Sequence, residues 1–224
     1  MVYKGNPLNP EIYKIIKDRI LFLEYKPGQI LNEKVLADEF GISRTPLRDV
    51  LSRLEWDRLV RILPRTGTMV TEIEFQKMMY TYQVRFEIEE LIGKLAGDRL
   101  GGEHSVRIDI LENRCAGLFD HPSPKELVLI DIDFRQVLAE AANNPVLHDI
   151  AGQLYDSTRR LWYITLQRGP WAEEVQALHD DIVSTKTAWM ENNANTFGTF
   201  RRAVLERHFE RIRAKFLSPP ALNS

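Results

Sequence analysis

The sequence predicts a mostly α-helical protein of two domains, with a small β-hairpin near the end of the first. Three observations support this fold class. Apolar residues recur at helical spacing on both sides of Gly41, two short strand-like runs flank Pro64–Gly67, and no alternating strand pattern follows Phe75. The 224 residues are enough for a small module in residues 1–71 and a bundle of about six or seven helices in residues 72–224.

The first domain is expected to begin with an amphipathic helix and to continue with a shorter one. The apolar face of the first helix comprises Ile12, Ile15, Ile16, Ile20 and Leu23. The shorter helix covers Glu33 to Phe40, and Leu36, Ala37 and Phe40 share its apolar face. It should end at Gly41, because glycine tolerates the left-handed conformation that is common at helix ends.

The next helix carries the first candidate binding residues. Ser43 is a suitable N-cap, since its hydroxyl can accept a backbone N–H of the first turn. The buried stripe is expected to comprise Leu47, Val50, Leu51 and Leu54. Arg44 and Arg48 lie four residues apart on the other face, and Thr45 borders the stripe. Arginines near a helix N-terminus are well placed to contact guanine edges in DNA, so these three residues are candidate DNA contacts.

A hairpin follows, with strands expected over Leu59–Leu63 and Thr68–Thr71. Its turn contains Arg65, Thr66 and Gly67, which could approach a phosphate or a minor groove. Helix, turn, helix and hairpin in this order are typical of a winged helix-turn-helix, a module that binds DNA. The alternative is a solvated basic helix on a helical protein of another kind.

The second domain consists of helical segments separated by breakers, among them Gly101-Gly102, His121–Pro124 and Asn143–Pro145. Thr71 and Glu74 have the spacing of a capping box, which predicts that its first helix starts there without a flexible linker. Ser123, Pro124 and Glu126 combine an N-cap, a proline at the first helical position and a reciprocal carboxylate. A helix is therefore expected to begin at Pro124.

Charge is distributed unevenly between the two domains. Residues 1–71 hold 12 Lys and Arg against 9 Asp and Glu, a net charge of +3, and the remainder holds 18 against 23, a net charge of −5. This suits double-stranded DNA at one domain and a different partner at the other. The lone cysteine, Cys115, fits a reducing compartment. Without a transmembrane-length apolar run or a signal-peptide pattern, a cytoplasmic protein with no membrane partner is expected.

Three polar residues occupy apolar-face positions in the second domain. Asp131 lies in line with Leu127, Phe134 and Leu138, and His179 and His208 occupy similar positions on later helices. If the three converge, they could bind one divalent transition metal such as zinc, nickel or manganese. The alternative is that each is an ordinary core residue whose hydrogen bonds are satisfied.

The segment PGQILNEKVLADEFGISRTPLRDVLSRLEWDRLV resembles the GntR family of bacterial transcriptional regulators. The resemblance rests on Pro27-Gly28, the run Ser43–Arg48 and the wing residue Gly67. It covers about the first third of the chain, and the remaining residues resemble the FadR-like branch with its all-helical FCD domain. The resemblance implies a homodimer that binds a palindromic operator and is modulated by a small organic acid or related metabolite.

The resemblance also bears on the metal. Metal-containing members of this branch have an aspartate followed four residues later by histidine, and their metal takes the carboxylate of the effector. Here Arg135 stands four residues after Asp131, where histidine is expected. We expect Arg135 to lie in the bundle cavity, where Asp131 or a bound carboxylate completes its guanidinium. The competing interpretation is a solvated arginine on the flank of the helix.

Arg85 and Glu89 are further candidate effector residues, because the matching arginine of relatives often faces the ligand cavity. They could instead form a simple intrahelical pair. The favoured interpretation is an effector-responsive regulator without enzymatic activity, and the sequence leaves two alternatives to it. One is a metal-dependent hydrolase built on the bundle, although no motif such as HExxH is present. The other is a constitutive DNA-binding protein without an effector.

Overall fold

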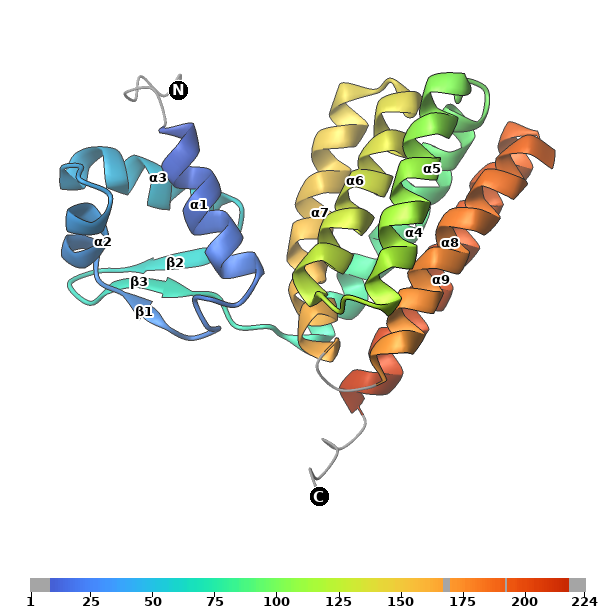
Figure 1. The fold of residues 1–224 in the computed structure, drawn as a ribbon. Coiled ribbons are helices and arrows are strands. Elements are labelled where there is room, and N and C mark those ends of the chain that lie inside the picture. Colours follow the sequence, from blue (N-terminus) through green and yellow to red (C-terminus); the bar gives the residue numbers. More distant parts are fainter. Residues whose placement is uncertain (1–8, 167–169, 192, 218–224) are drawn as a thin grey trace. The chain divides into compact units, whose positions relative to one another are not determined.

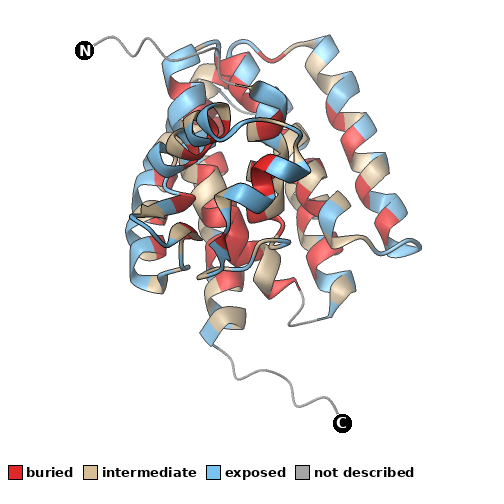
Figure 2. Ribbon diagram, turned by 90° about the vertical axis from the view of Figure 1, so that its left-hand side faces the viewer, coloured by how far each residue is buried: buried red, intermediate tan, exposed pale blue. Residues whose placement is uncertain are grey.

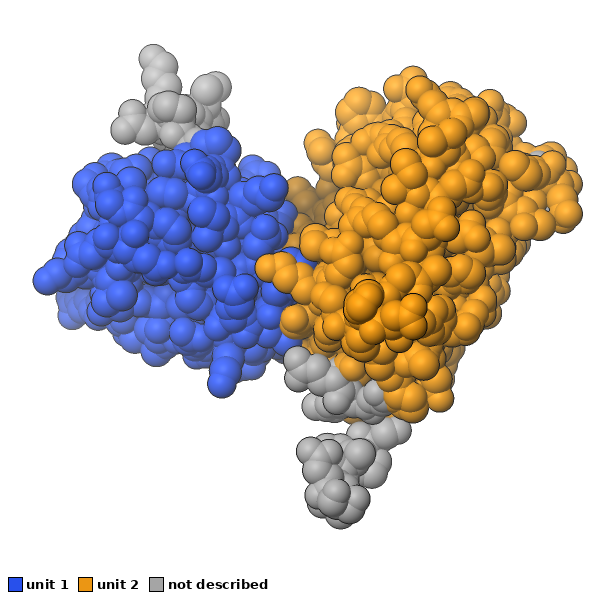
Figure 3. Space-filling model, viewed as in Figure 1, with its two compact units in different colours: residues 1–75 blue, residues 76–224 orange. Residues whose placement is uncertain are grey.

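The computed structural model describes residues 9–166, 170–191 and 193–217, and these form two compact units. Unit 1 extends to Phe75 and unit 2 begins at Gln76 (Figure 3). The described part of the chain is mostly helical, with one small three-stranded sheet in unit 1 (Figure 1). No helix within these ranges combines the length and the apolar character that crossing a bilayer requires.

The described part of unit 1 consists of three helices and three short strands. Their bounds are α1 Pro10–Leu21, β1 Ile30–Leu31, α2 Glu33–Glu39, α3 Arg44–Trp56, β2 Val60–Leu63 and β3 Gly67–Val70. The sheet order is β1-β3-β2 and both pairings are antiparallel. The sequence predicted the hairpin of β2 and β3 but not β1, because two residues are too few to show an alternating pattern.

The core of unit 1 is apolar. The fully buried stripe of α3 contains Leu47, Val50, Leu51 and Leu54, as the sequence predicted. From α1 the core takes Ile12, Ile16, Ile20 and Leu21. Leu23 was expected on the same face, but it lies beyond the end of the helix with a positive φ of 61°.

Two helix starts in the first half of the chain differ in detail from the sequence prediction. Ser43 is at the N-cap of α3, but its side chain makes no capping hydrogen bond. The Thr71 hydroxyl donates to the backbone carbonyls of Arg58 and Leu59, at 3.0 and 3.1 Å, and so closes the end of the hairpin. It is therefore engaged with the hairpin, and the next helix begins at Phe75.

Unit 2 is a helical bundle. Its elements are α4 Phe75–Gly97, α5 Gly102–Ala116, the 3₁₀ turn η1 Gly117–Phe119, α6 Pro124–Ala142, α7 Pro145–Thr165, α8 Trp171–Glu191 and α9 Ala194–Leu217. The six α-helices in the described part of unit 2 agree with the predicted six or seven. α5 packs against α6 and α8, and α9 packs against α7 and α8. Figure 2 shows that buried residues follow the inward faces of these helices.

The start of α6 illustrates how the sequence sets a helix boundary. Ser123 caps the helix, with its hydroxyl accepting the backbone N–H of Glu126 at 3.2 Å, and Pro124 is the first helical residue. The Glu126 carboxylate does not accept the backbone N–H of Ser123. It accepts two hydrogen bonds from Arg114 instead, the shorter of them at 2.7 Å. Asn143 ends the helix in the left-handed conformation.

α4 and α9 approach each other closely at two glycines. A Cβ at Gly93 would lie 2.8 Å from the Cα of Gly198, and a Cβ at Gly198 would lie 2.7 Å from the carbonyl oxygen of Glu90. Larger side chains would therefore separate the two helices. This contact fixes the height at which Arg201 of α9 faces Glu89 of α4, a pair of buried charged residues in the bundle core.

Candidate nucleic-acid interface and effector site

α3 presents its polar residues on the face opposite its buried stripe. Arg44, Thr45 and Arg48 are exposed, whereas Leu47 and Leu51 of the same helix are completely buried. The stripe fixes the rotation of the helix, because turning it would move Leu47 and Leu51 into water. The three candidate DNA contacts therefore point outward from a rigid helix.

Arg48 has an ion-pair partner that the sequence did not predict. Its Nε donates to Oε2 of Glu33 at 3.0 Å, across the corner between α2 and α3. The arginine side chain remains 66% exposed, while that of Glu33 is only 18% exposed. The carboxylate is thus set into the surface, and the guanidinium is presented to the outside.

The tip of the hairpin is exposed at Arg65 and Thr66. Gly67 is required by the backbone. Its φ is 129°, and an added Cβ would lie 2.8 Å from the carbonyl oxygen of Leu31 on β1. The glycine therefore lets β1 pair with β3, which makes its role in the hairpin at least partly structural.

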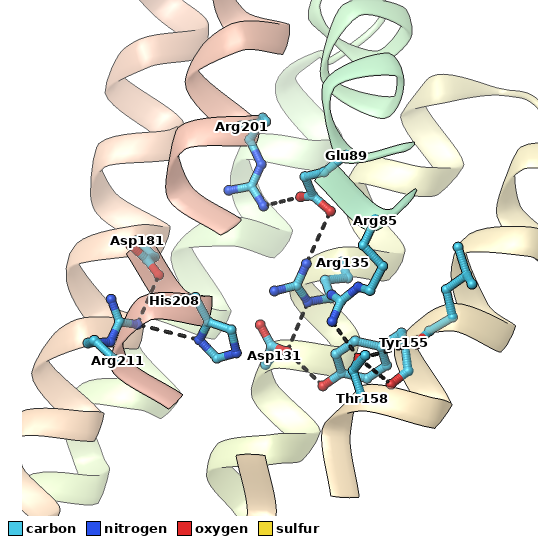
Figure 4. Close-up of polar contacts among 11 residues, drawn as sticks. Arg85, Glu89, Asp131, Arg135, Tyr155, Thr158, Asp181, Arg201, His208 and Arg211 are labelled. Carbon is cyan, nitrogen blue, oxygen red and sulfur yellow. Dashed lines mark hydrogen bonds and ion pairs between the residues drawn. The ribbon is translucent and has the colours of Figure 1, made fainter. Parts of the chain in front are cut away.

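In unit 2 a cluster of charged side chains lies in the bundle core (Figure 4). Arg135 of α6 donates from Nε to Oδ2 of Asp131 at 2.9 Å and from Nη1 to Oε2 of Glu89 at 3.2 Å. Arg201 of α9 donates to the other Glu89 oxygen at 2.5 Å. Tyr155 of α7 donates its hydroxyl to the same Asp131 oxygen at 2.6 Å. Four helices thus meet in one ionic network.

Arg85 completes this cluster from α4. It is 5% exposed, it donates to the Thr158 hydroxyl at 2.5 Å, and its guanidinium lies over the Tyr82 and Tyr155 rings. Within the described part of the chain it forms no ion pair with a carboxylate. The alternative of a simple intrahelical pair of Arg85 with Glu89 is therefore not found among these contacts, because Glu89 bonds to Arg135 and Arg201 instead.

The electrostatics of the cluster follow from burial and pairing. Burial alone would raise the pKa of Glu89, but Arg201 and Arg135 hold it below its usual value. Burial opposes the charge of Arg135, yet Asp131 and Glu89 raise its pKa overall. Burial lowers the pKa of Arg85. Arg85, Arg135 and Arg201 face the two carboxylates of Glu89 and Asp131, so the cluster has one more cationic side chain than anionic ones.

A cavity of about 170 Å³ adjoins this cluster. Its polar lining comes from α4, α6 and α7 and consists of Glu89, Arg135, Gln136, His148, Tyr155, Asp156 and Arg159. The structure therefore places Arg135 at the cavity, as the sequence predicted, and Glu89 lies beside it in the lining. Arg85 is not part of the lining, and within the cluster its guanidinium lies over the ring of Tyr155, which is part of the lining.

The structure does not assemble the metal site that the sequence suggested. No three His, Cys, Asp or Glu side chains within the described ranges are grouped to hold a metal ion. Asp131 is buried as expected, but its carboxylate already accepts from Arg135 and Tyr155. A guanidinium at this distance repels a cation, so the residues present do not fit a divalent metal.

The two histidines lie in different surroundings. His208 is buried against the Trp162 ring. Its pKa is lowered well below 6.5, mainly by burial and further by the charges of Arg211 and Arg135. The side chain of His179 remains 25% exposed and faces Asp180. His179 therefore lies at the border of the buried stripe of α8, which contains Val175, Leu178 and Ile182, and it does not join Asp131 and His208 in one site.

Tyr155, Thr158 and Arg201 of the cluster were missed in the sequence, and so was Arg159 of the cavity lining. A signal was present for Arg201. It stands four residues after Phe197 and four before Leu205, both completely buried, so it occupies an apolar-face position. Arginine at such a position is usually explained by its long stem reaching the surface, which makes this signal weak.

Comparison with known proteins agrees with this architecture. A family model described as bacterial regulatory proteins of the gntR family matches residues 8–70, and one described as FCD domain matches residues 80–185. The transcriptional repressor RspR of Escherichia coli (strain K12) is 23% identical over 178 residues, which cover 80% of this chain and 78% of RspR. The transcriptional regulator YdhC of Bacillus subtilis (strain 168) is 26% identical over 154 residues, which cover 68% of this chain and 69% of YdhC.

A solved structure, that of E. coli McbR/YncC, has the same fold. It superposes with a TM-score of 0.81 at 18% identity, over 94% of this chain and 99% of that one. The matches to the two family models account for both units, and the relatives are regulators whose sequences align across them. The chain belongs to the GntR family of bacterial transcriptional regulators and carries an FCD domain, the effector-binding domain, as its C-terminal part.

Proposed function

We propose that this regulator binds a palindromic operator as a homodimer and that a small carboxylate in the FCD cavity modulates this binding. The observation that carries the proposal is the opposite placement of charge in the two units. Unit 1 exposes Arg44 and Arg48 on a helix whose other face is buried. Unit 2 buries an excess of guanidinium groups beside a cavity.

For the operator, Arg44, Thr45 and Arg48 are the proposed major-groove contacts. A guanidinium can donate two hydrogen bonds to O6 and N7 of guanine, whereas a hydroxyl is less selective. Arg65 and Thr66 at the hairpin tip would contact phosphate or the minor groove, with Gly67 shaping the turn. A single α3 contacts only a few base pairs, so a dimer on a two-fold symmetric site gives the required length and specificity.

For the effector, the anion follows from the charges. A buried guanidinium is costly unless a carboxylate or another acceptor compensates it. The cluster has one more arginine than carboxylates, and Arg135 lies at its border with the cavity. A small organic acid would supply the missing negative charge, with Arg135 as its direct partner and Glu89 and Arg85 as neighbours of that contact.

Coupling between the two functions would run through α4. Glu89 on this helix holds Arg135 of α6 and Arg201 of α9, and α4 begins five residues after β3 ends. An acid bound to Arg135 would compete with Glu89 and so change how α4 is held in the bundle. The effector would then shift the population between operator-binding and non-binding dimers.

The test has two stages. A bound sequence is first selected from randomised duplexes, and sedimentation of the protein–DNA complex gives the number of protomers. A panel of small mono-, di- and tricarboxylates is then titrated against the complex formed by the wild type and by Arg135→Ala. We expect at least one acid to change operator affinity in the wild type and to lose most of this effect in the variant, whose basal binding stays intact.

The control is Arg107→Ala, which removes an arginine that pairs with Glu140 at the surface of the same unit. It should respond to the acid like the wild type. An acid that acts equally on Arg135→Ala and on the wild type would contradict the proposed effector site. Selection of a sequence with no response to any acid would favour a constitutive DNA-binding protein.

A further inference from the structure

Glu33 is a carboxylate on a surface that the proposed function turns toward DNA. A free acidic side chain there would repel phosphates and weaken every complex. Glu33 is not free, since its Oε2 accepts the Nε–H of Arg48 at 3.0 Å. The two residues are 15 positions apart and meet because the turn after Gly41 folds α3 back onto α2.

The position of the Glu33 carboxylate is also fixed by the start of its own helix, α2. Glu33 is the first residue of α2, and the Asn32 side chain accepts the backbone N–H groups of Lys34 and Val35 at 2.9 and 3.2 Å. One turn further on, Leu36 is buried in the core of unit 1. Residues three apart share a helix face, so Glu33 is directed toward α3. This explains why its side chain is largely covered.

The contact uses only one edge of the guanidinium. Within the described part of the chain, the terminal nitrogens Nη1 and Nη2 of Arg48 have no hydrogen-bond partner. These two nitrogens form the fork that can bond to O6 and N7 of one guanine. An ion pair this exposed contributes little to stability, so the fold alone gives no strong reason for it.

We infer that Glu33 is a positioning residue that sets the sequence preference of Arg48. By holding Nε, the carboxylate restricts the arginine to orientations in which its terminal nitrogens face a base edge. By neutralising the guanidinium in part, it also lowers the attraction of Arg48 to phosphates on arbitrary DNA. The inference rests on the proposed function, because it assumes that α3 contacts DNA.

The experiment compares base preferences in full-length protein. Sequences are selected from randomised duplexes by the wild type, Glu33→Ala, Arg48→Ala and the double variant. Asp38→Ala serves as matched control, because it removes one exposed carboxylate from the same helix. Thermal unfolding of each variant checks that unit 1 remains folded. Affinity for the selected and for a scrambled duplex is then measured at several salt concentrations.

Arg48→Ala should relax one base position per half-site by roughly tenfold. Glu33→Ala should relax the same position, by about threefold to tenfold, and raise affinity for the scrambled duplex at low salt. The double variant should be no less selective than Arg48→Ala, because Glu33 acts through Arg48. Asp38→Ala should keep the full base preference.

Three outcomes would overturn the inference. Glu33→Ala could retain the preference that Arg48→Ala loses, the double variant could relax a further position, or Asp38→Ala could relax the preference as much as Glu33→Ala. In each case the wild type still selects a sequence and the proposed function stands. If the wild type selects no sequence at all, the proposed function fails and the inference fails with it.

Discussion

The two units of this regulator place their charged side chains in opposite ways. In the described part of unit 1 the buried residues are apolar apart from Thr68, and the arginines of α3 lie outside. Unit 2 buries Arg85, Glu89, Asp131 and Arg201 at the centre of its bundle. Each unit has both a core and a charged surface, so the difference concerns where the functional charge lies.

The contrast explains what each unit is suited to bind. An exposed guanidinium keeps its hydration until a large partner such as DNA replaces it, and its loss costs affinity but little stability. A buried guanidinium has lost its water during folding and depends on carboxylates around it. Substitutions in unit 1 should therefore change binding, whereas substitutions in the cluster of unit 2 should change stability as well.

The strongest test of this contrast is Asp131→Ala. It leaves Arg135 and the Tyr155 hydroxyl without their shared acceptor, and breaking a buried pair costs about 3–5 kcal/mol in the free energy of unfolding. Denaturant unfolding of unit 2 measures this. Asp133→Ala removes a half-exposed carboxylate of the same helix, which pairs with Arg114, and it should cost at most about 1 kcal/mol. Equal costs for the two variants would contradict the contrast.

Arg48→Ala tests the other side of the comparison. It should weaken binding to the selected operator by about 1–3 kcal/mol, while the unfolding free energy changes little. Arg44→Ala should behave similarly. Arg53 is also on α3 and half-exposed but pairs with Asp57, so Arg53→Ala is the matched control and should bind nearly as the wild type does. Unchanged affinity in both Arg44→Ala and Arg48→Ala would remove α3 as the contacting helix.

The pH dependence of unit 2 should show the burial of His208. Its folded pKa lies well below 6.5, so the unfolded state binds a proton first as the pH falls. The stability contributed by neutral His208 is therefore complete above the unfolded pKa and declines below it. Between pH 8 and pH 5.5 this loss should reach about 1.4 kcal/mol. Denaturant unfolding over this range should give a slope that His208→Gln flattens, and His179→Gln, which removes a partly exposed imidazole of the same unit, is the matched control.

The smallest expected effect concerns metals. Arg135 already occupies the Asp131 carboxylate, so zinc, nickel or manganese should change the melting temperature of the demetallated protein by very little. Elemental analysis after loading should find no stoichiometric metal. Tight uptake of one ion, abolished in Asp131→Ala, would show that the guanidinium moves aside and would revive the metal site.

How much could be predicted from the sequence differs between the two units for the same reason. The stripe of α3 repeats every three to four residues, and an apolar core imposes this period directly. Arg44, Thr45 and Arg48 could be placed on the outer face because everything buried beside them was apolar. The contact between Glu33 and Arg48 could not be predicted, since the two residues lie on different helices and their distance depends on the turn between α2 and α3.

The sequence by itself determined the helical fold class, the hairpin, the buried stripe of α3 and the inward positions of Asp131 and His208, because each follows from local spacing. Only the tertiary structure decided which charged groups meet. It joined Arg135 to Glu89 and Asp131, brought Arg201 and Tyr155 into the same network, and left His179 outside it and partly exposed. Such contacts depend on the rotation and height of four packed helices, which the close approach of α4 and α9 helps to fix. Periodicity along one helix contains no information about either quantity in another.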